Sequence, residues 1–170
     1  GYVLAESLHH SIVSVYPALT ALKCKGSSFK AWAGVRTEGE ISLFTDGKFC
    51  KSERGELQLT EYGISGIPVF QISTYAVRAV REGHKAELRI NFMPELSEEE
   101  LRKLLYARKK ACPYKKEKEL LVGLFPEKLI KILISQKQVI SAIREFPLEV
   151  QDGMSFSQAQ VCSGGVDTTQ

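Results

Sequence analysis

Alternation of apolar and polar positions is the strongest pattern in the first part of the chain. Its apolar positions between residues 34 and 60 are Ile41, Leu43, Phe49, Leu57 and Leu59. Leu57 and Leu59 alternate with polar residues, which is the spacing of half-buried strands. The Asp46-Gly47 pair between Leu43 and Phe49 predicts a tight hairpin turn. We therefore expect a meander of short antiparallel strands here, and a further strand at residues 86–92, which alternate in the same way.

A helical period separates these two stretches. Apolar side chains recur every three or four positions over residues 67–81, with Ser65 placed to cap the start of the helix and Gly83 to end it. Residues 2–10 show a shorter apolar side of the same kind, without a capping residue before it. The sequence thus predicts one long helix between strands and a short one at the beginning.

Extended chain is predicted near both ends. Residues 12–24 mix β-branched and apolar side chains around Pro17, which favours extended chain with a break or bulge at the proline, as two strands or one bent strand. Strand character returns in residues 148–150 and 156–166, which the Asp152-Gly153 pair separates.

Helices replace strands in the stretch that begins at Pro94. Ser97 and Glu100 have the spacing of a capping box, so a helix is expected from there to about Lys110. Two further helices are expected, over residues 126–135 and 138–145, with Pro126 in the first turn. A β-rich unit interrupted by a helical insertion is the simplest account, because the last strands can then rejoin the first sheet. The predicted fold class is α+β.

Composition narrows the class of protein without naming a partner. The 170 residues are 44% hydrophobic and 25% charged, which is typical of a folded globular chain. The net charge of +3 is too small for a dedicated nucleic-acid binder, and no apolar run reaches the roughly 20 residues that cross a bilayer. We expect neither a membrane partner nor a nucleic-acid partner.

The cysteines and histidines suggest no catalytic or metal site. The four cysteines are far apart, without a CxxC pair or a histidine at metal-ligand spacing, so no metal is expected. We interpret them as reduced, buried thiols of a cytoplasmic protein, and Cys162 as a small buried apolar residue rather than a redox thiol. His9, His10 and His84 have no carboxylate or serine partner at motif spacing and are expected at exposed helix ends. Trp32 is expected to anchor the core or its edge.

Four stretches of the chain carry a resemblance to a known family. Residues 1–6 are similar to the end of a Gly-Asp-Gly-Tyr turn and the helix after it, and residues 16–19, YPAL, to the stretch that follows. Residues 59–68, LTEYGISGIP, resemble the most specific motif, and residues 159–166, AQVCSGGV, the return strand. In this order and spacing, the four resemble the bacterial NAD(P)/FAD-dependent oxidoreductases of the BaiN or aminoacetone-oxidase type.

The resemblance implies that this chain is an insert in a discontinuous FAD domain. Such inserts are small antiparallel β-barrels, similar in shape to translation-factor barrels, with an all-helical bundle attached. The implied units are residues 1–93 with 147–170 for the barrel and residues 94–146 for the bundle. The parent would bind FAD through a flanking Rossmann-type domain and use NAD(P)H and a small organic substrate. This chain alone would bind no FAD and would be inactive.

The resemblance also implies a set of cofactor contacts, which are Thr60, Tyr62, Gly63, Ser65, Gly66, Cys162, Gly164 and Gly165. The Gly63-Ile-Ser-Gly66 turn would offer backbone N–H groups to a flavin carbonyl, a phosphate or a substrate carboxylate, while an ordinary capped turn has the same pattern. Gly164-Gly165 would let the backbone approach a planar ligand, or would be a plain turn at a domain junction. Glu61 and Cys162 stand where many relatives have His and Thr, so we assign no catalytic residue.

The alternative hypothesis is a non-enzymatic β-barrel module that binds RNA or a protein partner. Its support is the mildly basic charge and the cations of residues 108–110 and 115–116. Such a run is also typical of a solvated helix end, where cations face the negative end of the helix dipole. We adopt this second interpretation of the run.

Overall fold

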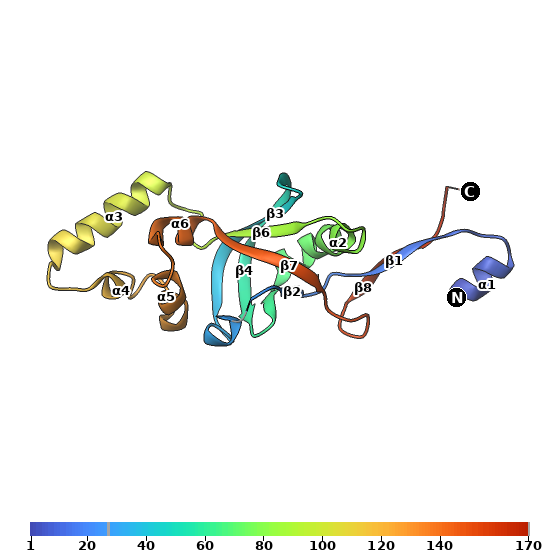
Figure 1. Cartoon of the computed structure of the whole chain (residues 1–170), viewed down its shortest axis with the longest axis horizontal. Coiled ribbons are helices and arrows are strands. Elements are labelled where there is room, and N and C mark those ends of the chain that lie inside the picture. The colour runs from blue at the N-terminus through green and yellow to red at the C-terminus, as the bar shows by residue number, and fades with distance from the viewer. Residues whose placement is uncertain (27, 170) are drawn as a thin grey trace.

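Six strands form a closed barrel at the centre of the molecule (Figure 1). The computed structural model describes residues 1–26 and 28–169. Around the barrel the strands follow the order β2, β5, β4, β3, β6, β7, and every neighbouring pair is antiparallel. Their bounds are β2 Leu22–Cys24, β3 Arg36–Thr45, β4 Lys48–Thr60, β5 Gly63–Ser65, β6 Ala86–Asn91 and β7 Phe146–Gly153. The barrel and the helices around it confirm the α+β class.

The β3–β4 hairpin supplies the two longest strands. Asp46 and Gly47 form its turn, both with positive φ (49° and 78°), as two-residue hairpin turns of this kind require. The predicted meander of short strands is wrong in one respect, because the hairpin consists of two strands of 10 and 13 residues. Four of the apolar positions named for these strands are fully buried, namely Ile41, Leu43, Leu57 and Leu59, but Phe49 is 61% exposed because it lies beside the turn of the hairpin.

The three-residue strand β2 closes the barrel. Leu22 pairs with Ile64 of β5 on one side and with Gly153 of β7 on the other. The Asp152-Gly153 pair therefore ends β7 inside the ladder, and it is not the break between two strands that the sequence predicted. Closure removes the free strand edges, which would otherwise expose unpaired backbone groups.

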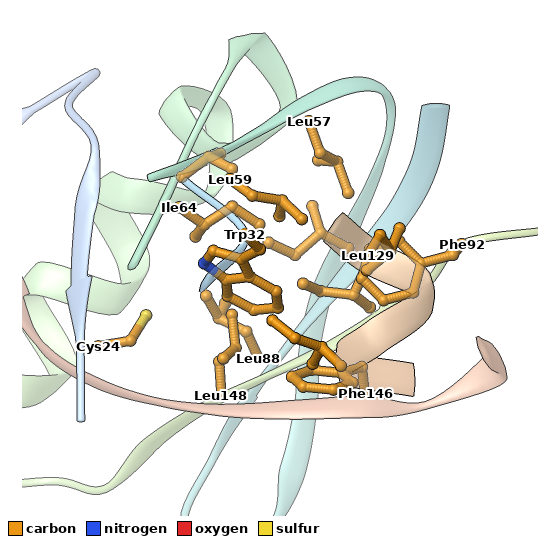
Figure 2. Packing of buried hydrophobic residues seen from close by; sticks show 14 of the residues in the cluster. Cys24, Trp32, Leu57, Leu59, Ile64, Leu88, Phe92, Leu129, Phe146 and Leu148 are labelled. Atoms are coloured by element: carbon orange, nitrogen blue, oxygen red, sulfur yellow. The ribbon is translucent and has the colours of Figure 1, made fainter. Parts of the chain in front are cut away.

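Trp32 lies at the centre of the barrel core (Figure 2). Only 1% of its surface is exposed, and its ring lies 5.4 Å from the rings of both Phe29 and Phe146. Its indole N–H donates to the Thr60 carbonyl at 3.1 Å, so the one polar atom of the ring is satisfied. The prediction that Trp32 anchors the core is confirmed.

Helix α2 (Ile67–Arg81) contacts both the barrel and the strands outside it. It packs against β4 and β7 of the barrel and against β1. The predicted helix is confirmed, and Val69, Ile72, Ala76 and Ala79 of its apolar positions are buried, whereas Tyr75 is 53% exposed. Gly83, with φ of 88°, follows the end of the helix, and β6 begins three residues later, as predicted.

Strands β1 (Ile12–Ala18) and β8 (Val161–Val166) form a separate two-stranded ribbon. In Figure 1 the ribbon extends away from the barrel, with α1 (Tyr2–Ser7) and both chain ends at its far end. Residues 12–24 form two strands, which was one of the expected arrangements, but the break between them is not at Pro17, which lies inside β1 opposite Cys162. The chain turns at Leu19, where φ is 49°, and the register of β1 shifts between Val13 and Tyr16. A ribbon has free edges, where a proline without an N–H is tolerated.

The return of the last strands to the first sheet is only partly as predicted. Strand β7 rejoins the barrel beside β6 and β2, whereas β8 pairs with β1 and leaves the barrel. The expected strand over residues 156–166 begins at Val161, because a turn precedes it.

The described helices between β6 and β7 are α3 Glu98–Ala111, α4 Glu117–Leu120, α5 Glu127–Leu133 and α6 Val139–Arg144. The capping box is formed, because the Ser97 hydroxyl accepts from the Glu100 N–H and the Glu100 carboxylate accepts from the Ser97 N–H. The sequence did not predict α4. Leu101, Leu129 and Ile143 belong to the same buried cluster as the barrel core, so the helices pack onto the barrel.

Candidate functional site

The eight candidate residues lie in two separate places. Five are on or beside the barrel: Thr60 at the end of β4, Tyr62 in the turn, Gly63 and Ser65 in β5, and Gly66 before α2. The other three are on the ribbon strand β8: Cys162, Gly164 and Gly165. The cavity that Ser65 and Gly66 line contains none of the β8 residues. The structure therefore brings together members within each group but does not gather the eight around one cavity.

Both glycines of the barrel group are required by close backbone packing. A Cβ at Gly63 would lie 2.4 Å from the Leu22 carbonyl oxygen, and one at Gly66 would lie 2.5 Å from the Glu56 carbonyl oxygen. Both residues also have positive φ (146° and 114°), which disfavours any side chain. These glycines let β2 approach β5 and let α2 begin against β4.

Ser65 does not cap α2, contrary to the prediction from the sequence. Its backbone is the last residue of β5 and pairs with Gln58, while Gly66 occupies the cap position without a side-chain cap bond. The Ser65 side chain instead lines a cavity of about 440 Å³ together with Arg36, Arg54 and Pro68. The serine is 8% exposed, and its hydroxyl has no hydrogen-bond partner among the described residues.

Thr60 and Tyr62 contribute mainly backbone contacts. The Thr60 carbonyl accepts from the Trp32 indole, and the Tyr62 carbonyl accepts from the Cys24 N–H at 2.9 Å. The Thr60 hydroxyl is buried and lacks a partner within residues 1–26 and 28–169. The turn is thus tied to the core through its main chain.

The two ribbon glycines differ in what surrounds them. A Cβ at Gly164 would lie 2.1 Å from the Ser14 carbonyl oxygen, so this glycine is needed for the pairing of β8 with β1. A Cβ at Gly165 would meet only the Tyr2 ring, at 3.6 Å, although φ there is 123°. Gly165 is therefore the ribbon glycine that faces a side chain rather than backbone, and it is buried. An aromatic ring already lies against it.

The sequence comparison agrees with this architecture. Residues 16–161 match the family described as HI0933-like protein barrel and H2TH domain. The chain belongs to this family. It is also 37% identical over 185 residues, covering 99% of this chain, to the 3-dehydro-bile acid delta(4,6)-reductase of Clostridium scindens. The chain spans 45% of the length of that relative. The BaiN-type resemblance seen in the sequence is confirmed.

In this HI0933-like domain the four cysteines are free thiols, as predicted, but only Cys24 is buried. Burial raises the pKa of the Cys24 thiol to about 12. The interpretation of Cys162 as a buried apolar residue is wrong, because it is exposed on β8 with its sulfur 3.7 Å from the Tyr2 hydroxyl. Ribbon strands have no core above them, which explains the exposure.

His84 has a carboxylate partner that the sequence did not predict. Its Nδ1 lies 2.7 Å from Asp46, whose other oxygen accepts from the Lys85 N–H at 2.9 Å. These hydrogen bonds, with the backbone bond from Lys85 the larger cause, lower the pKa of Asp46. The three residues fix the exposed turn of the β3–β4 hairpin to the start of β6. We regard this group as structural.

The basic run at the end of α3 matches a solvated helix end. Lys109 and Lys110 of its last turn are exposed, and Arg108 is half-buried. The Arg108 guanidinium donates to the Val122 carbonyl at 2.6 Å, and the Lys109 ammonium donates to the carbonyls of Pro113 and Lys115. These carbonyls belong to the chain after α3, so the two cations hold that chain against the end of the helix.

Sequence reasoning missed the residues that complete the cavity at the start of α2. Arg36, Arg54 and Gly55 lie on β3 and β4, far from the motif in sequence, so no local pattern links them to it. Gly55 inside a strand was the available signal, since it marks close backbone approach. Among the described residues, no cluster of three or more His, Cys, Asp or Glu side chains is placed to hold a metal, and no helix is long and apolar enough to cross a membrane.

Proposed function

We propose that the chain is the insert region of a larger FAD-dependent oxidoreductase, in which it covers the flavin and the substrate. The observation that carries the proposal is the match to a reductase over 99% of this chain but only 45% of the length of that relative. The LTEYGISGIP and AQVCSGGV stretches support the same assignment. The redox chemistry would belong to the flavin, while this chain would position and shield it.

The proposed insert has two units. The first comprises residues 1–93 and 147–170 and holds the barrel, the ribbon, α1 and α2. The second comprises residues 94–146 and holds α3 to α6. Support for a fixed arrangement comes from the shared buried cluster, because helices that bury side chains in the barrel core have little freedom to move separately.

The described residues alone do not fit a complete FAD. Gly63, Gly66 and Gly164 have their open sides filled by backbone of this chain, whereas Gly165 faces only the Tyr2 ring, whose place a ligand ring would have to take. The sequence contains no GxGxxG fingerprint. We therefore assign the FAD phosphates to a flanking Rossmann-type domain of the parent and contacts with the flavin ring to the Gly165 side of the ribbon. NAD(P)H and a small organic substrate would complete the reaction in the bacterial cytoplasm.

The test is the flavin content of two purified proteins, this chain and its full-length parent. We expect the parent to show the visible absorbance of about one bound FAD and the chain to be colourless, because the phosphate contacts lie outside it. A yellow chain with stoichiometric flavin would refute the insert assignment. A colourless parent that binds no added FAD would refute the assignment to a flavoprotein.

The role of Gly165 is tested in the parent with Gly165→Ala. The added methyl group would stand between the backbone and a planar ring, so we expect the Kd of FAD to rise about tenfold, measured by titration of the apoprotein. Gly123→Ala is the matched control, because Gly123 also has positive φ and has no atoms near its missing Cβ. Equal affinities of the two variants would remove Gly165 from the flavin site.

A further inference from the structure

The first turn of α2 has backbone donors that no described residue satisfies. The N–H groups of Ile67 and Val69 have no hydrogen-bond partner among the described residues, and Pro68 between them has no N–H. The helix has 15 residues, no side-chain cap and no acidic residue in its first turn. Its positive end is therefore uncompensated, which favours a bound anion.

A buried serine whose hydroxyl has no partner among the described residues lies at the same place. Ser65 is 8% exposed and lines the cavity of about 440 Å³ into which α2 begins. The fully buried hydroxyls without a described partner are those of Thr20 and Thr60, so the Ser65 oxygen keeps contact with solvent. A ligand in the cavity would accept or donate the hydrogen bond that this hydroxyl can form.

The charges around the cavity favour an anion. Arg36 and Arg54 line it from β3 and β4. Glu56 also lines it, but its carboxylate accepts from Arg36 at 2.8 Å and is compensated. Among the described residues, the ion pair of Arg54 is a long one, with 3.8 Å between its guanidinium and the Glu95 carboxylate. Both side chains are exposed. A net positive lining remains, with a guanidinium free to turn toward a ligand.

The apolar part of the lining sets the kind of molecule. Pro68 and Phe70 form one wall, and Gly55 lets this wall approach β4, because a Cβ there would lie 3.2 Å from the Pro68 ring. Small ligand sites typically combine such apolar walls with a few fixed polar groups. A free inorganic ion would leave the apolar wall unused.

We propose that this cavity binds the anionic oxygen group of a small organic molecule, a carboxylate or a phosphate ester. The Ser65 hydroxyl and the N–H groups of Ile67 and Val69 hold the oxygens, Arg54 neutralises the charge, and the organic part lies on Pro68 and Phe70. The inference rests on the proposed function, because it names the chemical class of the molecule that the insert would bind at the start of α2 within the oxidoreductase.

Amide NMR shifts of the isolated chain, followed during titration, test the inference without flavin. The probes are hexanoate, hexyl phosphate and hexanol, which share an alkyl chain and differ in the head group. We expect hexanoate, hexyl phosphate or both to shift the amides of Ile67 and Val69 with a Kd in the millimolar range or below, and hexanol to leave them unchanged. The head group that binds more tightly identifies the source of the anion. Absent shifts, or equal shifts with hexanol, overturn the inference.

Two variants and one control assign the contacts. Ser65→Ala removes a bond to a charged group and is expected to raise the Kd about tenfold, and Arg54→Gln to raise it severalfold. Arg102→Gln, an equally exposed arginine on α3, should leave the Kd unchanged. Unchanged affinity in Ser65→Ala and Arg54→Gln, both folded by their amide spectra, overturns the inference. Flavin binding by the parent is measured separately, so either proposal can fail alone.

Discussion

The barrel and the ribbon use the same antiparallel pairing but are stabilised differently. Inside the barrel, large apolar side chains such as Trp32 and Leu57 are almost completely buried. On the ribbon, Val13, Val161 and Val166 keep 41% to 50% of their surface exposed, and α1 beside it buries no residue. A two-stranded sheet without a core is only marginally stable in water. Backbone pairing therefore sets the shape of both regions, while burial makes only the barrel stable.

The largest expected effect is that of Trp32→Ala. The variant would leave a void between Phe29 and Phe146 and remove the hydrogen bond to Thr60. We expect the free energy of unfolding in urea to fall by about 3–5 kcal/mol. The ribbon control Val161→Ala should change it by less than about 0.5 kcal/mol. Similar losses in both variants would mean that the ribbon contributes to global stability as the barrel does.

Next in size is the difference in thiol reactivity between the two regions. With its pKa raised to about 12, Cys24 has on the order of a thousandfold less reactive thiolate at pH 8 than an ordinary thiol. We expect iodoacetamide to label Cys162 in the native protein and to label Cys24 only in urea, as read by peptide mass spectrometry. Equal native labelling of both would contradict the burial of Cys24.

The same shift gives a pH dependence of stability. The pKa of Cys24 is higher in the folded chain than the usual value of 9.0. The contribution of the protonated Cys24 thiol to the free energy of unfolding is therefore complete below pH 9 and is lost as the pH rises from 9 toward 12. Cys24→Ala should flatten this alkaline limb of the stability profile.

A smaller effect separates the glycines of the two regions. Gly63→Ala would force β2 and β5 apart and should lower the free energy of unfolding by about 2–3 kcal/mol. Gly164→Ala meets the Ser14 carbonyl at a similar overlap. We expect it to speed amide hydrogen exchange in β1 and β8 while global unfolding changes by less than about 0.5 kcal/mol. Loss of global stability in Gly164→Ala would show that the ribbon and the barrel unfold together.

The smallest effect concerns two serines near α2. Ser73 is fully buried, accepts from the Thr20 N–H at 3.1 Å and donates to the Phe70 carbonyl at 2.8 Å. Ser73→Ala should therefore cost about 1–2 kcal/mol in urea unfolding. Ser65→Ala should be close to neutral, because its hydroxyl loses no partner. A large loss in Ser65→Ala would indicate a contact of the hydroxyl that the structure does not contain.

Local signals predicted the elements that local interactions determine. The Asp46-Gly47 turn, the capping box at Ser97 and the helical period of α2 act over a few residues, and each was found where the sequence placed it. The pairing of β1 with β8 was not predicted, because it joins opposite ends of the chain. The capping role of Ser65 was wrong for a similar reason, since pairing with Gln58 holds its backbone in a strand.

The structure gives the candidate glycines a packing role, and their role in binding a cofactor stays a prediction. The motif glycines do mark close approach, as expected from their lack of a Cβ. At Gly63, Gly66 and Gly164 the approaching group is backbone of the same chain, which no local pattern could distinguish from a ligand. The arginines beside Ser65 come from another hairpin and became visible only with the fold.

The register of the ribbon makes the domain exchangeable. Ile12 and Val166 face each other across the ladder, so the segment between them begins and ends at the same place. This segment could therefore be exchanged with that of a related protein by joining the chains at these two residues. Chimaeras built at this junction would carry the barrel and its helices from one protein into another. They would show which properties of the donor protein move with this segment and which properties of the receiving protein are unchanged.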